Sequence, residues 1–314
     1  MIRLHRELTV IVLVVWSAAV FSVAQQKGQY VPGQFGLNAG VLPDPGFTFA
    51  NLTVNYSADS LRSSTSGALP VNGTYAFWAT ENWFFYVPER KILGGKFMSL
   101  ASLNLANGSL TADAPFGISA GGEGMSDTWV QPVNFGWHLN RADAWFGYAF
   151  VAPTGKFSPL ASNNVGSGYW GNHFINGTTL YLTKNKGTSM SLATDWEFHE
   201  QKRDINITPG EAFTDEWGLG QILPLKKDES RLLQVGVIGY DQWQVTANKG
   251  LTATVPYYSV HAIGVQSNFL LPGKGVSLFL KYEPEYIAKA RPQGRTVVFG
   301  LGWNLRDPRK APSK

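Results

Sequence analysis

The stretch Met190-Ser-Leu-Ala-Thr-Asp-Trp-Glu-Phe-His199 decides the fold, because its side chains alternate strictly between two kinds. One set is bulky and mostly apolar, and consists of Met190, Leu192, Thr194, Trp196 and Phe198. The other set is small, polar or charged, and consists of Ser191, Ala193, Asp195, Glu197 and His199. Successive side chains of a β-strand point to opposite faces, so this stretch predicts a strand with one apolar and one polar face.

The same alternation recurs along the chain, and Asn-Gly and Pro-Gly pairs mark turns between the repeats. We predict twelve strands, at 47–57, 73–87, 94–106, 127–139, 143–152, 173–184, 187–199, 213–224, 231–246, 257–271, 275–288 and 295–305. Residues 117–124, with four glycines, are predicted to form a loop. An even number of antiparallel strands, each about ten residues long, is typical of a transmembrane barrel.

The composition narrows the possible classes of protein. The 314 residues include no cysteine, which excludes a disulfide scaffold, a thiolate zinc site and a cysteine nucleophile. Charged residues make up 15%, against about 25% in an ordinary soluble domain. Beyond the N-terminal 24 residues there is no apolar run of the length that a membrane-spanning helix needs. The net charge of +4 comes from scattered Lys and Arg, so we expect no nucleic-acid partner.

The N-terminal residues have the pattern of an export signal. Arg3, His5 and Arg6 precede the apolar run Leu8–Trp16, and Ser22-Val23-Ala24 offers small residues for a signal peptidase. The alternative is an uncleaved anchor, but the apolar run is short for spanning. We therefore predict a signal peptide at 1–24, cleaved after Ala24, and export from the cytoplasm.

Alternation alone is compatible with a soluble β-protein and with a membrane barrel. A soluble β-sandwich would pack its apolar face against a second sheet, whereas a membrane barrel turns that face to lipid and its polar face to a lumen. Aromatic residues near predicted strand ends, such as Trp83, Trp129, Trp243 and Trp303, favour interfacial girdles and hence the barrel. We predict an all-β, transmembrane, antiparallel up-and-down barrel at 47–305, after a pre-barrel segment at 25–46 and before a polar tail at 306–314.

Eight stretches in order resemble one known family. They are GQYVPG (28–33), LPDPGFTF (42–49), YSAD (56–59), KILGGKF (91–97), GMSDTWVQPVNFGWH (124–138), APTGKF (152–157), VGVIGYDQWQVT (235–246) and EYIAKARPQG (285–294). The chain is similar, over 28–294, to the outer-membrane family named for the meta-pathway of phenol degradation. The resemblance implies a barrel of the Gram-negative outer membrane, often found beside genes for degrading aromatic compounds, and it implies no catalytic residues.

The polar faces of three predicted strands supply the candidate lumen residues. These are Asp195, Glu197, His199, Tyr240, Gln242, Gln244, Lys281, Glu283 and Glu285. In one interpretation they are pore-wall residues, solvated or paired across the barrel. In the other, the excess of carboxylates forms a cation-favouring constriction, and Tyr240, Gln242 and Gln244 offer neutral hydrogen bonds to a ligand. We expect no metal, no cofactor and no catalytic residue.

The predicted function is a passive outer-membrane channel for small, hydrophobic or aromatic compounds. Its expected partners are outer-membrane lipid and lipopolysaccharide, the outer-membrane assembly machinery and a small-molecule ligand, and we expect a monomer. The alternatives are a secreted soluble β-sandwich that binds carbohydrate and an outer-membrane lipid-modifying enzyme. The sequence leaves open the compound, the direction of passage, and whether inward side chains or residues 25–46 fill the lumen.

Overall fold

The computed structural model describes residues 28–305, apart from 71, 113–117, 160 and 251–254. The predicted signal peptide at 1–24 and the predicted tail at 306–314 lie outside the described residues. The strands are β1 (Gly46–Leu61), β2 (Gly73–Val87), β3 (Lys96–Ala112), β4 (Ile118–Met125), β5 (Thr128–His138), β6 (Ala142–Ala152), β7 (Gly171–Tyr181), β8 (Thr188–His199), β9 (Ala212–Pro224), β10 (Leu232–Gln244), β11 (Ser259–Leu271), β12 (Val276–Lys289) and β13 (Pro292–Asn304). One 3₁₀ turn, Pro272–Lys274, joins β11 to β12.

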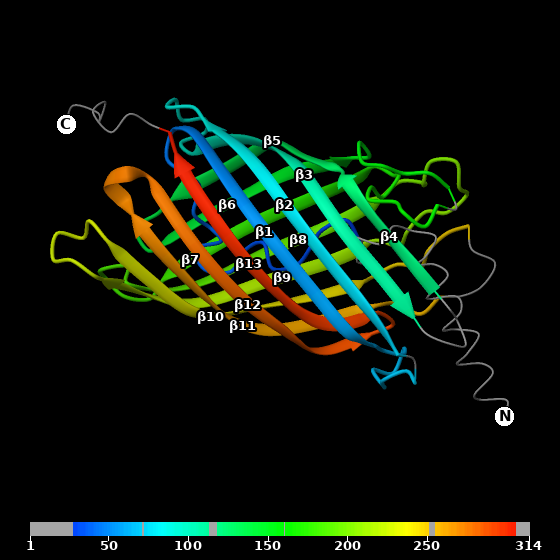
Figure 1. The fold of residues 1–314 in the computed structure, drawn as a ribbon. Helices are drawn as coiled ribbons and strands as arrows, with labels where there is room; N and C mark the ends of the chain where they lie inside the picture. Colours follow the sequence, from blue (N-terminus) through cyan, green and yellow to red (C-terminus); the bar gives the residue numbers. More distant parts are fainter. Residues whose placement is uncertain (1–27, 71, 113–117, 160, 251–254, 306–314) are drawn as a thin grey trace.

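The strands form one antiparallel sheet that closes on itself. Strands that follow one another pair around the ring, and β1 pairs with β13 from Thr48↔Asn304 to Leu61↔Pro292. The strands wind diagonally around the barrel axis (Figure 1). Closure through β1–β3 and β5–β13 joins these strands in a ring without a free end, and lipid would not tolerate an open sheet edge. The predicted transmembrane barrel is confirmed, and the sandwich alternative is wrong because a single sheet encloses the interior.

Strands β4 and β5 share one position in the ring, so the barrel has twelve strands as predicted. Both pair with β3. β4 pairs with its second half, from Leu105↔Met125 to Ala112↔Ile118, and β5 pairs with its first half, from Lys96↔Gly136 to Ala101↔Val130. The loop predicted at 117–124 is therefore wrong for the described residues 118–124, which lie within β4. Backbone hydrogen bonds to β3 need no side chains, so a glycine-rich strand lacks the alternation by which we recognised the others.

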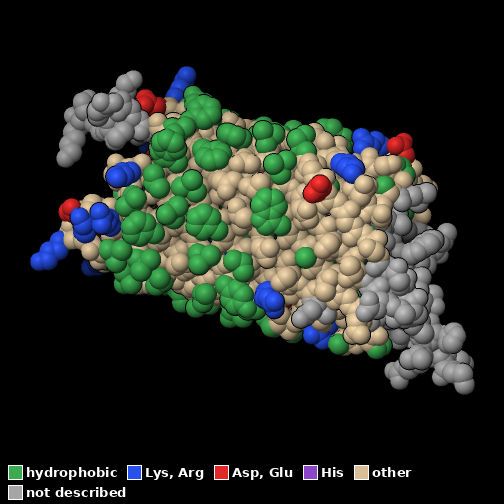
Figure 2. All heavy atoms as spheres, in the orientation of Figure 1, with side chains coloured by type: hydrophobic (Ala, Val, Ile, Leu, Met, Phe, Trp, Pro, Cys, Tyr) green, Lys and Arg blue, Asp and Glu red, His purple; other side chains and the backbone are tan. Residues whose placement is uncertain are grey.

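The exterior of the barrel is apolar along most strands. Leu192 is 44% exposed, whereas its neighbour Ala193 is 2% exposed and faces the interior. Hydrophobic side chains cover much of the outer face in Figure 2, and Lys and Arg side chains lie toward both ends of it. An apolar band around a closed sheet is the surface that a bilayer-embedded barrel presents to lipid. Among the described residues, no helix is long and apolar enough to cross a bilayer.

The connections differ in length at the two ends of the barrel. At the end where β1 begins, the turns 139–141, 182–187, 225–231 and 272–275 are short. At the opposite end, residues 153–170, 200–211 and 245–258 form longer connections. We call these the short-turn end and the long-loop end. In outer-membrane barrels the short turns lie on the periplasmic side and the longer loops outside.

Candidate functional site: the lumen

Residues 28–45, which we call the lumen segment, run through the interior of the barrel. At the long-loop end, the Gln29 side chain donates to Ser167 Oγ at 2.7 Å and to the Tyr169 carbonyl at 2.9 Å. At the short-turn end, Lys96 Nζ donates to the Pro43 carbonyl at 3.1 Å. The chain then enters β1 at Gly46 and turns back along the wall. The segment therefore traverses the lumen from one end to the other.

Two buried charged residues hold the middle of the lumen segment. The Glu216 carboxylate of β9 accepts hydrogen bonds from Tyr30 Oη (2.7 Å) and from the backbone N–H groups of Gly33, Gln34 and Phe35 (2.8, 3.2 and 2.6 Å). Lys281 Nζ of β12 donates to the carbonyls of the same three residues. Backbone polar groups buried without partners are costly, so this clamp is what allows an irregular segment to lie inside the barrel.

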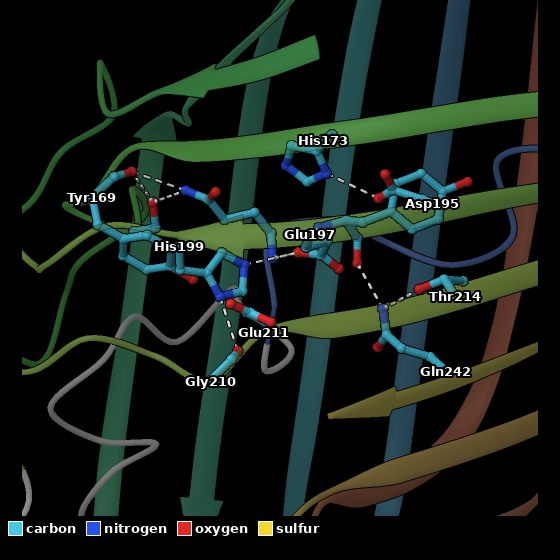
Figure 3. A network of polar contacts seen from close by, with 12 residues as sticks. Tyr169, His173, Asp195, Glu197, His199, Gly210, Glu211, Thr214 and Gln242 are labelled. Atoms are coloured by element: carbon cyan, nitrogen blue, oxygen red, sulfur yellow. Dashed lines mark hydrogen bonds and ion pairs between the residues drawn. The ribbon is translucent and has the colours of Figure 1, made fainter. Parts of the chain in front are cut away.

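A second group of buried polar residues holds the start of the segment (Figure 3). Glu197 Oε2 accepts from the backbone N–H groups of Gln29 (2.7 Å) and Tyr30 (3.2 Å). His199 lies 3.1 Å from the same oxygen through Nε2, while its Nδ1 donates to the Gly210 carbonyl at 2.9 Å. This pair links the lumen segment to the loop after β8.

The other candidate residues fix the wall and the loops. Asp195 pairs with His173 Nδ1 at 2.9 Å, and Gln242 donates to the Tyr30 carbonyl at 3.3 Å. Glu285 accepts from Tyr240 Oη at 3.1 Å, which ties β12 to β10. The remaining contacts tie Glu285 to Tyr56 and to Arg291, and Gln244 to Thr246 and Asn248. These interactions are structural links among the strands and loops.

Glycines on the inner wall make room for the lumen segment. A Cβ added to Gly218 would lie 2.9 Å from the Gly36 carbonyl group, and one added to Gly220 would lie 2.8 Å from Leu37 Cδ2. Gly36 itself has φ +131°, a conformation that side chains rarely adopt. Gly218 and Gly220, on the inner face of β9, therefore leave room for Gly36 and Leu37.

Most hydrogen bonds of the lumen segment go to β6–β12, and a cavity lies on its other side. The larger chamber, as we call it, has a volume of about 390 Å³. Its lining is mainly apolar and aromatic, and includes Leu52, Trp83, Phe85, Leu100, Trp129 and Phe279. The interfacial-girdle prediction is therefore wrong for Trp83 and Trp129, which are buried on the inner face. A smaller chamber of about 70 Å³ lies toward the long-loop end, where Ser126, Asp127 and Val165 line it. The two chambers share Tyr30, Gln34, Trp83 and Trp129 in their linings.

The loop 153–170 is fastened above the break between β4 and β5. The Asp127 carboxylate accepts from the N–H groups of Gly155 (3.0 Å) and Ser167 (2.7 Å) and from the Ser167 hydroxyl. Burial raises the pKa of Asp127 above its usual value, and these hydrogen bonds oppose that shift. Burial also lowers the pKa of nearby Lys202 to about 7, although the Asp127 charge opposes it. Polar contacts thus hold this loop in place at the long-loop end.

All nine candidate residues face the barrel interior, and the structure brings only some of them to the lumen segment. Glu197, Gln242 and Lys281 hydrogen-bond to it, whereas Asp195, His199, Tyr240, Gln244 and Glu285 bond to the wall and loops. A Cβ at Gly33 would lie 2.7 Å from Glu283 Oε2, so Glu283 also lines the seat of the segment. Sequence reasoning missed Glu216, although extending the β9 alternation from Gly218 by two residues would have placed it inside. Within the described parts of the chain, no group of three His, Asp or Glu could hold a metal ion.

The closed sheet, the apolar exterior and the polar interior define a transmembrane barrel of the outer-membrane type. The chain belongs to the family described as "Putative MetA-pathway of phenol degradation", which matches residues 58–301. This confirms the resemblance predicted from the sequence. Comparison with curated proteins gives no match.

Solved structures with the same fold are outer-membrane barrels. The COG4313 outer membrane channel from Pseudomonas putida F1 is 13% identical, with a TM-score of 0.71 over 88% of this chain and 99% of that one. The β domain of the Bordetella autotransporter BrkA is 11% identical, with a TM-score of 0.55 over 83% and 100%. The transport unit of the autotransporter AIDA-I from Escherichia coli is also 11% identical, with a TM-score of 0.51 over 94% and 97%. At these identities the likeness shows the fold.

Proposed function

We propose that this protein is an outer-membrane channel through which small, hydrophobic or aromatic compounds pass by diffusion. Family membership and a barrel fold shared with an outer membrane channel support this proposal. It includes a signal peptide removed after Ala24, a monomeric barrel inserted by the outer-membrane assembly machinery, and lipopolysaccharide as a lipid neighbour. No catalytic role is assigned to any residue.

The larger chamber is the observation that carries the proposal. Ligand pockets typically measure about 300–1,000 Å³ and are mostly apolar, with a few polar groups. At about 390 Å³, with Trp83, Trp129, Leu100 and Phe279 in its lining, this chamber falls in that class. An apolar cavity of about 150 Å³ already binds benzene, so one aromatic ring fits here with room to spare.

The lumen segment determines where a compound could travel. Its hydrogen bonds go mostly to β6–β12, and the open volume lies in the two chambers, which β1, β2, β3 and β5 line together with residues of β6, β7 and β11–β13. Glu197, Glu216 and Lys281 have partners in the segment, so these three charges would not select among compounds. To cross the membrane, a compound must still displace the aromatic side chains that lie between the two chambers, or displace part of the lumen segment.

Uptake by intact cells tests this function. We expect Gram-negative cells that produce the protein to take up a radiolabelled one-ring aromatic compound faster than cells without it, since lipopolysaccharide slows its permeation through lipid. Leu100→Trp, which narrows the larger chamber, should slow uptake. Thr80→Leu, on the outward face of β2, is the matched control and should leave uptake unchanged. Equal uptake with and without the protein would refute the proposal.

A further inference from the structure

Glu81 on the inner face of β2 is a buried carboxylate with an unusual set of neighbours. It is 5% exposed and accepts a hydrogen bond from Trp83 Nε1 at 3.1 Å. Among the described residues, no Lys, Arg or His lies within ion-pair distance of it. Burying a carboxylate with one neutral donor costs much of its hydration free energy. A native protein that keeps such a group normally uses it.

The smaller chamber beside Glu81 has more acceptors than donors. Asn104, which lines this chamber, has its Oδ1 buried without a hydrogen-bond partner among the described atoms; Gln29 Oε1 is also unpartnered but lies against Gly171 of β7. The amide nitrogens of the same two residues are already used, by the Asp127 carbonyl and by Ser167 and Tyr169. Trp129 Nε1 lies 3.3 Å from Gln131 Oε1. Glu81 and Asn104 therefore leave hydrogen-bond acceptor capacity on the wall of this chamber.

The position of this acceptor site relative to the larger chamber indicates what could supply the donor. Trp83 and Trp129 line both chambers, with ring centroids 6.3 Å apart, and Tyr30 lies 6.2 Å from Trp129. A volume of about 70 Å³ accepts a small polar substituent, whereas about 390 Å³ accepts a ring. The aromatic cluster separates a place for a ring from a place for a donor group.

We infer that the two chambers together bind a small aromatic molecule that carries a hydrogen-bond donor. The ring lies in the larger chamber against Trp83 and Trp129, and its hydroxyl or ammonium group donates to Glu81 and Asn104 in the smaller one. Glu81 is then the residue that distinguishes donor-bearing aromatics from bare hydrocarbons and from carboxylates. This inference rests on the proposed channel function and names the compounds that the channel selects.

Equilibrium binding to the full-length barrel in detergent tests the inference, with protein-free micelles subtracted. The probes are benzyl alcohol, benzylamine, toluene and benzoate, which share a ring and differ in the polar group. We expect the wild type to bind a donor-bearing probe more tightly than toluene and to bind benzoate weakest. Glu81→Leu should weaken binding of the preferred donor-bearing probe by about tenfold or more, as expected for a hydrogen bond to a carboxylate, and leave toluene unchanged.

Matched variants separate recognition from folding. Thr80→Leu, the outward neighbour, should behave as wild type, and Leu100→Trp, which narrows the larger chamber, should weaken binding of all probes, toluene included. Glu81→Gln preserves shape if the leucine variant fails to give the heat-modifiable band of a folded barrel. If the site prefers an ammonium group, Glu81→Gln should no longer prefer benzylamine. If the site prefers a hydroxyl group, Glu81→Gln should retain most of the binding of benzyl alcohol. Either pattern supports the inference.

The overturning results are equally specific. Equal affinities of wild type for toluene and benzyl alcohol, or equal losses of both in Glu81→Leu, would show that Glu81 does not recognise a donor. Tight binding of benzoate would show the same. If cellular uptake still depends on the protein while these preferences are absent, the channel function stands and this inference fails. If uptake fails as well, the proposed function fails first.

Discussion

Replacing Glu216 by alanine should release the lumen segment from the wall. The carboxylate accepts four hydrogen bonds from residues 30–35, at 2.6–3.2 Å, and it is 2% exposed. Water can enter the vacated space and replace part of this bonding, so each bond contributes about 0.5–1.5 kcal/mol net, or about 2–6 kcal/mol together. At about 1.4 kcal/mol per factor of ten, even the lower figure shifts the docked equilibrium about 30-fold.

Hydrogen exchange measured by mass spectrometry reads this equilibrium directly. The N–H groups of Gly33, Gln34 and Phe35 bond to Glu216, so their protection depends on docking. We expect their exchange in Glu216→Ala to be about 30-fold faster or more, in line with the loss estimated above. In planar bilayers the same variant should conduct more than wild type, because the segment no longer fills that part of the lumen.

The control is Asp215→Asn, which removes a charge from the adjacent, outward-facing position of β9. It should leave both the exchange of residues 33–35 and the conductance as in wild type, and both variants must give the mobility of a folded barrel. Unchanged exchange at residues 33–35 in folded Glu216→Ala would refute the clamp. Faster exchange without higher conductance would show that the segment does not limit ion flow.

Lipid-facing and loop residues give the remaining predictions. Leu192→Lys, near the middle of β8 and facing lipid, should destabilise the barrel by about 2–4 kcal/mol, measured by denaturant unfolding in lipid vesicles, and equal stability would contradict the outward assignment. Asp127→Asn weakens hydrogen bonds to Gly155 and Ser167 and should cost about 2–4 kcal/mol of loop packing, so trypsin should cut after Lys156 faster than in wild type. The buried Lys202 has its pKa lowered from 10.5 to about 7, and the unfolded chain binds more protons between these values. Stability should therefore rise from pH 7 to pH 10, and Lys202→Met should flatten that rise in thermal unfolding.

Local alternation was enough to predict the barrel, the strand positions and the face to which each residue points. Each strand signals its own two faces through a period of two, and no distant residue is needed to see it. For this reason Asp195, Glu197, Lys281 and Glu283 could be placed inside the barrel before their neighbours were known. The same rule failed for β4, because Gly121, Gly122 and Gly124 have no side chains to alternate.

What fills the lumen could not be predicted in this way. A polar inner face suits water and suits a protein segment equally, since both supply hydrogen-bond partners. Gly218 and Gly220 alternate with Trp217 and Leu219 in the sequence, and only the folded chain shows Gly36 and Leu37 seated against the two glycines.

Sequence by itself therefore determined the barrel, and tertiary structure decided its interior. The contacts that close the lumen join residues far apart in the chain: Phe35 and Glu216 are separated by 181 positions. The two chambers exist because the lumen segment bonds mostly to β6–β12 and leaves the wall around Trp83 and Trp129 uncovered. Periodicity records how one strand divides its side chains between two faces, whereas the partner of a buried charge is set by which segments the closed sheet brings together.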